Sequence, residues 1–184
     1  MKTNESLAMY VFRLAATLLL ITAVVAAALA GVNSITAPVI AQLKAEKLQQ
    51  AINEVLPGGG DAVAFTDNTG WVSAVYKSDA GYAVEVTPTT GFNGAITMMV
   101  GIDTEGNVLG ISVVSQTETA GLGAVCAAKT EAGQSFRGDF VGLGGSVAVD
   151  KDGGEIDSIT GATITSRAVC DGVNAALECV ANMG

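Results

Sequence analysis

A run of nineteen uncharged residues, 14–32, constrains the fold of this chain more than any other feature. As a helix rising 1.5 Å per residue, it is close to the length needed to cross the hydrocarbon core of a membrane. A cleaved signal peptide is the alternative, because Ala28-Leu29-Ala30 before Gly31 fits the small-residue cleavage pattern. The apolar core of a signal peptide usually spans only about 7 to 15 residues. The length of the run therefore favours an uncleaved transmembrane helix.

The charges beside this run predict its orientation. Lys2 and Arg13 precede it, whereas Lys44 and Lys47 follow it, so the basic residues on the two sides are equal in number. Arg13 directly abuts the apolar segment, which favours a cytoplasmic N-terminus over residues 1–13. The remainder of the chain would then lie outside the cytoplasm.

Residues beyond the run predict a linker helix over 33–60 and one α+β domain over 61–184. Apolar residues recur at near-helical spacing from 39 to 55, and Leu56-Pro57-Gly58-Gly59-Gly60 ends that pattern. Alternating segments then indicate strands at residues 71–77, 82–87, 94–102 and 108–114. The connections between them are too short for crossover helices, so we expect an antiparallel sheet with flanking helices.

The last third of the chain predicts shorter elements and one long helix. We expect a short helix at 124–130, a loop or strand at 136–140, a strand at 146–149 and a turn at 151–155. Val169, Val173, Leu177 and Val180 follow at intervals of four, four and three residues, which places them on one face of a helix. This helix would begin near Thr163 and run to about residue 181.

Composition excludes several classes of function. The net charge of −9 does not favour nucleic acid, which needs clustered lysine and arginine. The absence of histidine removes the serine–histidine–aspartate triad, the cysteine–histidine pair and imidazole ligation of a metal. Cys126, Cys170 and Cys179 have no C-x-x-C spacing, so neither a zinc knuckle nor an iron–sulfur cluster is indicated. The sequence allows a Cys126–Cys170 or Cys126–Cys179 bridge, and buried free thiols are the expectation we favour.

Four hydroxyl side chains lie within residues 160–166, where the final helix is predicted to begin. A helix N-terminus offers unpaired N–H donors and the positive end of the helix dipole, so it can hold a phosphate without any basic side chain. The alternative is purely structural, because serine and threonine are common helix caps and a Gly-Ala pair is common in turns. On either interpretation, Thr163 lies at or beside the N-cap.

The run Asp157-Ser158-Ile159-Thr160-Gly161-Ala162-Thr163 resembles the flavinylation pattern Asp-x-x-(Ser/Thr)-Gly-Ala-(Thr/Ser) of the covalent FMN-binding domain family. In that family a flavin transferase moves FMN from FAD onto the hydroxyl of the last residue, forming a phosphoester. The resemblance implies that Thr163 carries FMN covalently and that Asp157, Thr160, Gly161 and Ala162 complete the motif.

Three of the neighbouring side chains have two interpretations each. Asp157 would accept backbone N–H bonds in its own loop, or it would help hold the metal that such a transferase uses; we favour the loop role. Thr165 and Ser166 would donate hydrogen bonds to the phosphate or only cap the first helical turn.

A second segment, Glu118-Thr119-Ala120-Gly121-Leu122-Gly123, is similar to a Glu-Thr-Pro-Gly-Leu-Gly loop that packs beside the flavin in one branch of the family. The resemblance implies that Glu118, Thr119, Gly121, Leu122 and Gly123 contact the cofactor. Ala120 replaces the usual proline, so we expect a less rigid loop. Gln116 and Thr117 lie where related chains often carry histidine, so no proton-handling role transfers to them.

The apolar run followed by Asn33-Ser34-Ile35-Thr36-Ala37-Pro38 looks like the start of the G subunits of Rnf-type electron-transport complexes. The resemblance implies a membrane-anchored electron-transfer subunit with no catalytic residue of its own, in a complex that passes electrons between ferredoxin and NAD and exports Na⁺ or H⁺. Its partners would be the other membrane subunits, a flavin transferase and membrane lipid.

Three alternatives stay open at this point. The chain would be a C-subunit-like component of a Na⁺-translocating NADH:quinone oxidoreductase, or a free-standing extracytoplasmic flavoprotein. The third, which involves no redox chemistry, is an anchored binding module in which the motif is only a helix cap.

Overall fold

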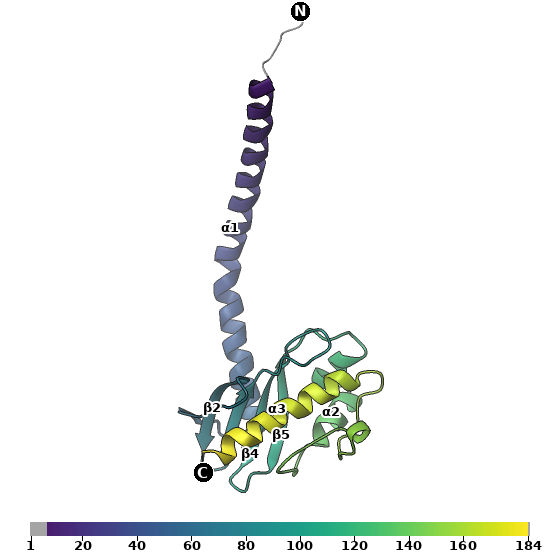
Figure 1. The fold of residues 1–184 in the computed structure, drawn as a ribbon. Helices are drawn as coiled ribbons and strands as arrows, with labels where there is room; N and C mark the ends of the chain where they lie inside the picture. The colour runs from purple at the N-terminus through teal and green to yellow at the C-terminus, as the bar shows by residue number, and fades with distance from the viewer. Residues whose placement is uncertain (1–6, 184) are drawn as a thin grey trace, which may run out of the picture. The chain divides into compact units, whose positions relative to one another are not determined.

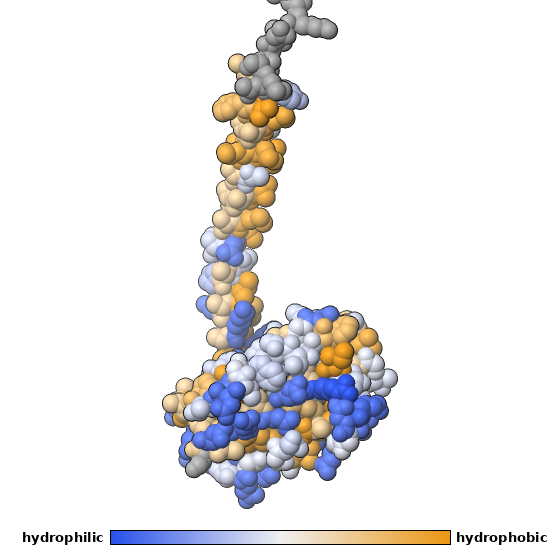
Figure 2. Space-filling model, viewed as in Figure 1, coloured by the Kyte–Doolittle hydropathy of each residue, from blue (hydrophilic) through white to orange (hydrophobic). Residues whose placement is uncertain are grey.

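A computed structural model of the protein describes residues 7–183 and divides the chain into two units, residues 1–45 and 46–184 (Figure 1). The first unit is the larger part of helix α1 (Leu7–Val55). Its apolar side chains are exposed along the whole stretch that the sequence predicts to cross the membrane (Figure 2). Among the described residues, α1 is the one helix long and apolar enough to span a bilayer.

Helix α1 is continuous through residues 33–38, where the sequence indicated a change from membrane helix to linker. Pro38 lies inside the helix. Proline removes one backbone hydrogen bond, but the turns on either side keep theirs, and the hydroxyl of Thr36 donates to the Val32 carbonyl at 3.0 Å. The predicted end of the helix is confirmed, because α1 stops at Val55, just before Pro57.

The second unit contains a five-stranded antiparallel sheet in the order β1-β2-β3-β4-β5. The strands are β1 (Asp61–Val63), β2 (Val72–Ser78), β3 (Gly81–Val86), β4 (Thr97–Asp103) and β5 (Val108–Ser115). The four predicted strands and their antiparallel pairing are therefore confirmed. The edge strand β1 was missed because its three residues are too few to show an alternating pattern.

Each face of this sheet is covered by a helix. On one face Ile52 and Val55, from the end of α1, pack with Ala83 and Met99. Helix α3 (Thr163–Ala181) lies on the opposite face, as Figure 1 shows. Its predicted apolar residues are all buried, which confirms the predicted helix and its core-facing side: Val169, Val173, Leu177 and Val180.

The segment between β5 and α3 holds three short helices. They are η1 (Gly123–Ala127), α2 (Glu131–Gly138) and η2 (Asp150–Asp152). The expectation of a loop or strand over 136–140 is wrong, because α2 includes Phe136. Its N-cap Thr130 accepts a hydrogen bond from the Gly133 N–H, and the buried Phe136 ring meets Phe140 edge-to-face with centroids 5.5 Å apart.

The expected strand at residues 146–149 is also wrong. The side chain of Asn174 on α3 accepts a hydrogen bond from the Val147 N–H at 2.8 Å and donates one to the Val147 carbonyl at 2.9 Å. These are the groups that a neighbouring strand would use, so only an isolated bridge between Val149 and Ile156 forms.

All three cysteines are buried free thiols, as we expected. Burial raises the pKa of Cys126 to about 11 and the pKa of Cys170 to about 12. Both side chains are therefore neutral and weakly reactive at physiological pH.

Candidate functional site

Helix α3 begins at Thr163 without a capping side chain. Ala162 occupies the N-cap position, and its methyl group cannot accept a hydrogen bond from the first turn of the helix. The first backbone bond of the helix runs from the Ser166 N–H to the Ala162 carbonyl at 3.0 Å, so the three N–H groups before it have no partner inside the helix. Together with the helix dipole, these donors form a site suited to a phosphate.

The turn that leads into α3 is held by Ser166, whose side chain is fully buried. Its hydroxyl accepts a hydrogen bond from the Ile159 N–H at 3.0 Å and donates one to the Ala162 carbonyl at 3.1 Å. Gly161 has a φ of +74°, a left-handed conformation that costs glycine little. Ser166 therefore fastens the turn that presents Thr163.

Asp150 performs the loop role that we expected of Asp157. The Ser158 N–H donates to the Asp150 carboxylate at 3.1 Å, and the Lys151 ammonium donates to the same carboxylate at 2.6 Å. The bonds from Lys151 and then Ser158 lower the pKa of Asp150. The Asp157 side chain is exposed and close enough to Asp139 for its charge to add to the effect of burial in raising the pKa of Asp139.

The second motif meets the first through Glu118, which lies in the loop after β5 and is 8% exposed. One oxygen of its carboxylate accepts a hydrogen bond from the Thr165 hydroxyl at 2.6 Å, and the other accepts one from the Asn93 N–H at 2.9 Å. Thr165 is therefore engaged with Glu118 rather than serving as a cap. Three segments far apart in the sequence are joined at this one carboxylate.

Gly123 makes this contact possible. A Cβ at Gly123 would lie 2.4 Å from the Thr165 hydroxyl oxygen and 2.6 Å from a Glu118 carboxylate oxygen. Neither atom could remain in place beside a larger side chain. Glycine is therefore required here for close packing, and its φ is unexceptional.

A cavity of about 340 Å³ lies where the two motifs meet. Most of the residues that the resemblance assigns to the cofactor line it: Glu118, Thr119, Leu122, Gly123, Gly161, Ala162, Thr163 and Thr165. Asp157, Thr160 and Gly121 do not line it. Thr163 lines the cavity and is also partly exposed to solvent.

The sequence interpretation missed two residues of the cavity wall, Phe92 and Ile164. Phe92 is 64% exposed, Ile164 47% and Leu122 43%, and all three are large apolar side chains at the same cavity. Figure 2 shows apolar side chains gathered at the end of the domain where α3 begins. A signal for Phe92 was available, since it is an aromatic residue in the turn-rich stretch Thr89-Thr90-Gly91-Phe92-Asn93-Gly94.

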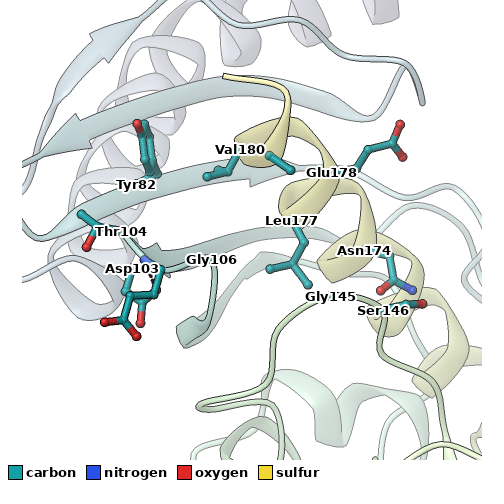
Figure 3. A pocket seen from close by; sticks show the side chains of 12 residues that line it. Tyr82, Asp103, Thr104, Gly106, Gly145, Ser146, Asn174, Leu177, Glu178 and Val180 are labelled. Carbon is teal, nitrogen blue, oxygen red and sulfur yellow. Dashed lines mark hydrogen bonds between the residues drawn. The ribbon is translucent and has the colours of Figure 1, made fainter. Parts of the chain in front are cut away.

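A larger cavity of about 650 Å³ lies at the other end of α3 and contains no residue of either motif. Figure 3 shows Leu177 at its centre, between the β4–β5 turn and the loop at Gly145. Its described lining includes the carboxylates of Asp103, Glu105 and Glu178 and no lysine or arginine. Such a surface repels a phosphate, so the smaller cavity is the candidate site.

Comparisons with known proteins place these observations in a family. Residues 91–178 match the FMN-binding domain family, and residues 6–55 match the RnfG N-terminal region. The chain is 35% identical to the G subunit of the Na(+)-translocating ferredoxin:NAD(+) oxidoreductase complex of Acetobacterium woodii, over 94% of this chain and 93% of that protein. It is 33% identical to the G subunit of the ion-translocating oxidoreductase complex of Methanosarcina acetivorans, over 89% and 91%.

A third relative is the G subunit of the proton-translocating ferredoxin:NAD(+) oxidoreductase complex of Clostridium ljungdahlii, which is 36% identical over 82% of this chain and 80% of that protein. The match to the RnfG N-terminal region covers the long apolar helix, and the match to the FMN-binding domain covers the residues that line the cavity at the start of α3. The chain therefore belongs to the family of G subunits of ion-translocating oxidoreductase complexes and carries an FMN-binding domain at the membrane.

Proposed function

We propose that this protein carries FMN in a phosphoester bond to Thr163 and relays single electrons within a ferredoxin:NAD oxidoreductase complex that translocates Na⁺ or H⁺. The observation that supports this most strongly is the position of Thr163, at an uncapped helix start on the edge of a cavity with apolar walls. The names of the relatives supply the reaction of the complex.

The start of α3 fits the phosphate of such a cofactor. A phosphate esterified to Thr163 keeps negative charge, which the helix dipole and the three N–H groups without a partner inside the helix would stabilise. Because the N-cap is alanine, no side-chain oxygen competes for those donors. The partly exposed Thr163 is also accessible to a flavin transferase.

The cavity walls fit a flat aromatic ring. Phe92, Leu122 and Ile164 expose apolar surface that a bound ring would cover, which removes an unfavourable contact with water. When bound, the flavin supplies the redox chemistry, and the protein supplies position and electrostatics. Covalent attachment prevents loss of the cofactor, as a permanent electron relay requires.

The same proposal includes the membrane arrangement and the partners. Arg13 beside the apolar run favours a cytoplasmic N-terminus, with the FMN domain on the other side of the membrane. The other membrane subunits of the complex would exchange electrons with it, and a flavin transferase would load it. Co-purification with those subunits separates this arrangement from a free-standing flavoprotein.

The test is the intact mass of the full chain, produced with a flavin transferase, beside Thr163→Ala and Thr163→Ser. We expect the wild type to gain the mass of one FMN minus one water and to fluoresce on a denaturing gel. Thr163→Ala should lose both signals, whereas Thr163→Ser should keep them because it retains the hydroxyl. An unmodified wild type from the native membrane, or a flavinylated Thr163→Ala, would overturn the proposal.

A further inference from the structure

We propose that Glu118 is a positioning residue that joins the walls of the cofactor cavity, and that its negative charge makes the bound flavin harder to reduce. This inference rests on the proposed FMN at Thr163. It assigns to Glu118 an electrostatic effect on the flavin, in addition to its packing beside the cofactor.

The charge of Glu118 is stabilised by neutral groups. Its two carboxylate oxygens accept from the Thr165 hydroxyl at 2.6 Å and from the Asn93 backbone N–H at 2.9 Å. No lysine or arginine belongs to the described lining of the cavity. Arg137 donates to the backbone carbonyls of Cys126 and Ala128 at 2.7 and 3.0 Å. Within residues 7–183, no ion pair therefore cancels the negative charge at the cavity.

The carboxylate is also held in one place. A Cβ at Gly123 would lie 2.6 Å from one of its oxygens, and a Cβ at Gly91 would lie 2.9 Å from the other. Two glycines from separate loops thus shape the space that the carboxylate fills. A charge fixed in this way has a constant distance to any group bound in the cavity.

The neighbouring thiol indicates that this charge acts through the protein interior. Burial is the largest cause of the raised pKa of Cys126, the charge of Glu118 is the next, and the charge of Arg137 has a smaller effect in the opposite direction. An electron that arrives in the cavity adds negative charge beside Glu118, and water screens the repulsion less than it would for a surface carboxylate because the Glu118 side chain is buried. The reduction potential should therefore be lower than it would be beside a neutral side chain.

Glu118→Gln separates this effect from a purely structural role. The glutamine carbonyl can accept from the Asn93 N–H, and its amide can donate to the Thr165 hydroxyl oxygen, so both contacts persist while the charge is removed. A residue that only joins the loops would leave the potential unchanged in this variant.

The matched control is Glu178→Gln. Glu178 lies on the same helix, thirteen residues beyond Thr165, which is about 20 Å along the helix axis. It accepts a hydrogen bond from the Asn68 amide at 3.0 Å, and glutamine can also accept that bond. The substitution and the change in net charge are therefore the same in both variants, whereas Glu178 is exposed and lies far from the cavity.

The experiment uses full-length wild type, Glu118→Gln and Glu178→Gln, each flavinylated in a host with a flavin transferase and checked by intact mass. Reduction potentials are then measured by optical redox titration in detergent. We expect a more positive potential for Glu118→Gln, at low and at high salt, and an unchanged potential for Glu178→Gln. Equal potentials for wild type and Glu118→Gln, or an equal shift in Glu178→Gln, would overturn the inference.

A second variant keeps the test decisive if Glu118→Gln fails to fold. Thr165→Val removes the hydroxyl that offsets the carboxylate charge, so at alkaline pH, where the carboxylate keeps its charge, it should shift the potential in the opposite direction, to a more negative value; a positive shift under that condition would overturn the inference. A wild type without FMN in the initial mass measurement would refute the proposed function before any potential is measured, and the inference with it.

Discussion

The turn that presents Thr163 should depend on the Ser166 hydroxyl, and Ser166→Ala tests this. The substitution deletes both hydrogen bonds of that hydroxyl, but only one of the two backbone groups that it contacts is left without a partner. The Ala162 carbonyl still accepts from the Ser166 N–H at 3.0 Å, whereas the Ile159 N–H loses its acceptor at 3.0 Å. An unsatisfied donor at a partly buried site costs about 1–2 kcal/mol.

Alanine is the better helix former by about 0.5 kcal/mol, which reduces the net loss to about 1 kcal/mol. For a chain of 184 residues this corresponds to a decrease in Tm of about 2–4 °C. The assay is thermal unfolding of the full, unflavinylated chain in detergent, followed by circular dichroism. We also expect slower flavinylation, because the loosened turn presents Thr163 less often in the correct geometry.

Thr160→Ala is the matched control, since it removes an exposed hydroxyl from the same motif. Its effect on the free energy of unfolding should stay within about 0.5 kcal/mol. A Ser166→Ala chain that melts at or above the wild-type temperature would refute the reasoning, because the turn would then not depend on the Ser166 bond.

Two further predictions follow from pKa shifts. Cys126, with a pKa of about 11, is ionised to about one part in a thousand at pH 8, so the native chain should resist maleimide labelling, whereas all three cysteines should label after unfolding. Rapid labelling of the folded chain would contradict this. Burial and then the charge of Asp157 raise the pKa of Asp139, so this carboxyl binds protons more tightly in the folded state, and its contribution to stability decreases as pH rises through the folded pKa. Asp139→Asn should therefore raise the Tm at neutral pH and change it little well below pH 4. A lower Tm of this variant at neutral pH would contradict the predicted direction of the effect.

Much of the fold was predictable from local patterns. The apolar run, the four alternating segments and the apolar face of the last helix each depend on side-chain spacing within one element, and the structure confirms all of them. Thr163 at the start of α3 was predictable for the same reason, because the motif immediately precedes a helical pattern.

The errors arose where partners are distant in the sequence. Residues 146–149 have the composition of a strand, but Asn174 takes the backbone groups of Val147 that a strand would need. Phe136 was not expected in a helix because the start of α2 is marked in the sequence by one residue only, the N-cap Thr130. A single capping residue is weak evidence for a helix. We expected Asp157 to accept the backbone N–H bond in this loop, but Asp150 accepts it from Ser158. The tertiary fold, rather than the local motif, decides which carboxylate lies near that N–H group.

By itself, the sequence determined the membrane helix, four of the five strands, the final helix and the hydroxyl at its start, because each of these follows from residues close together in the chain. Only the tertiary structure decided what surrounds that hydroxyl. Glu118 meets Thr165 across 47 positions, and Phe92 reaches the same cavity from a third segment. Such contacts depend on how the sheet and α3 pack together, and the spacing of residues along one segment carries no information about that packing.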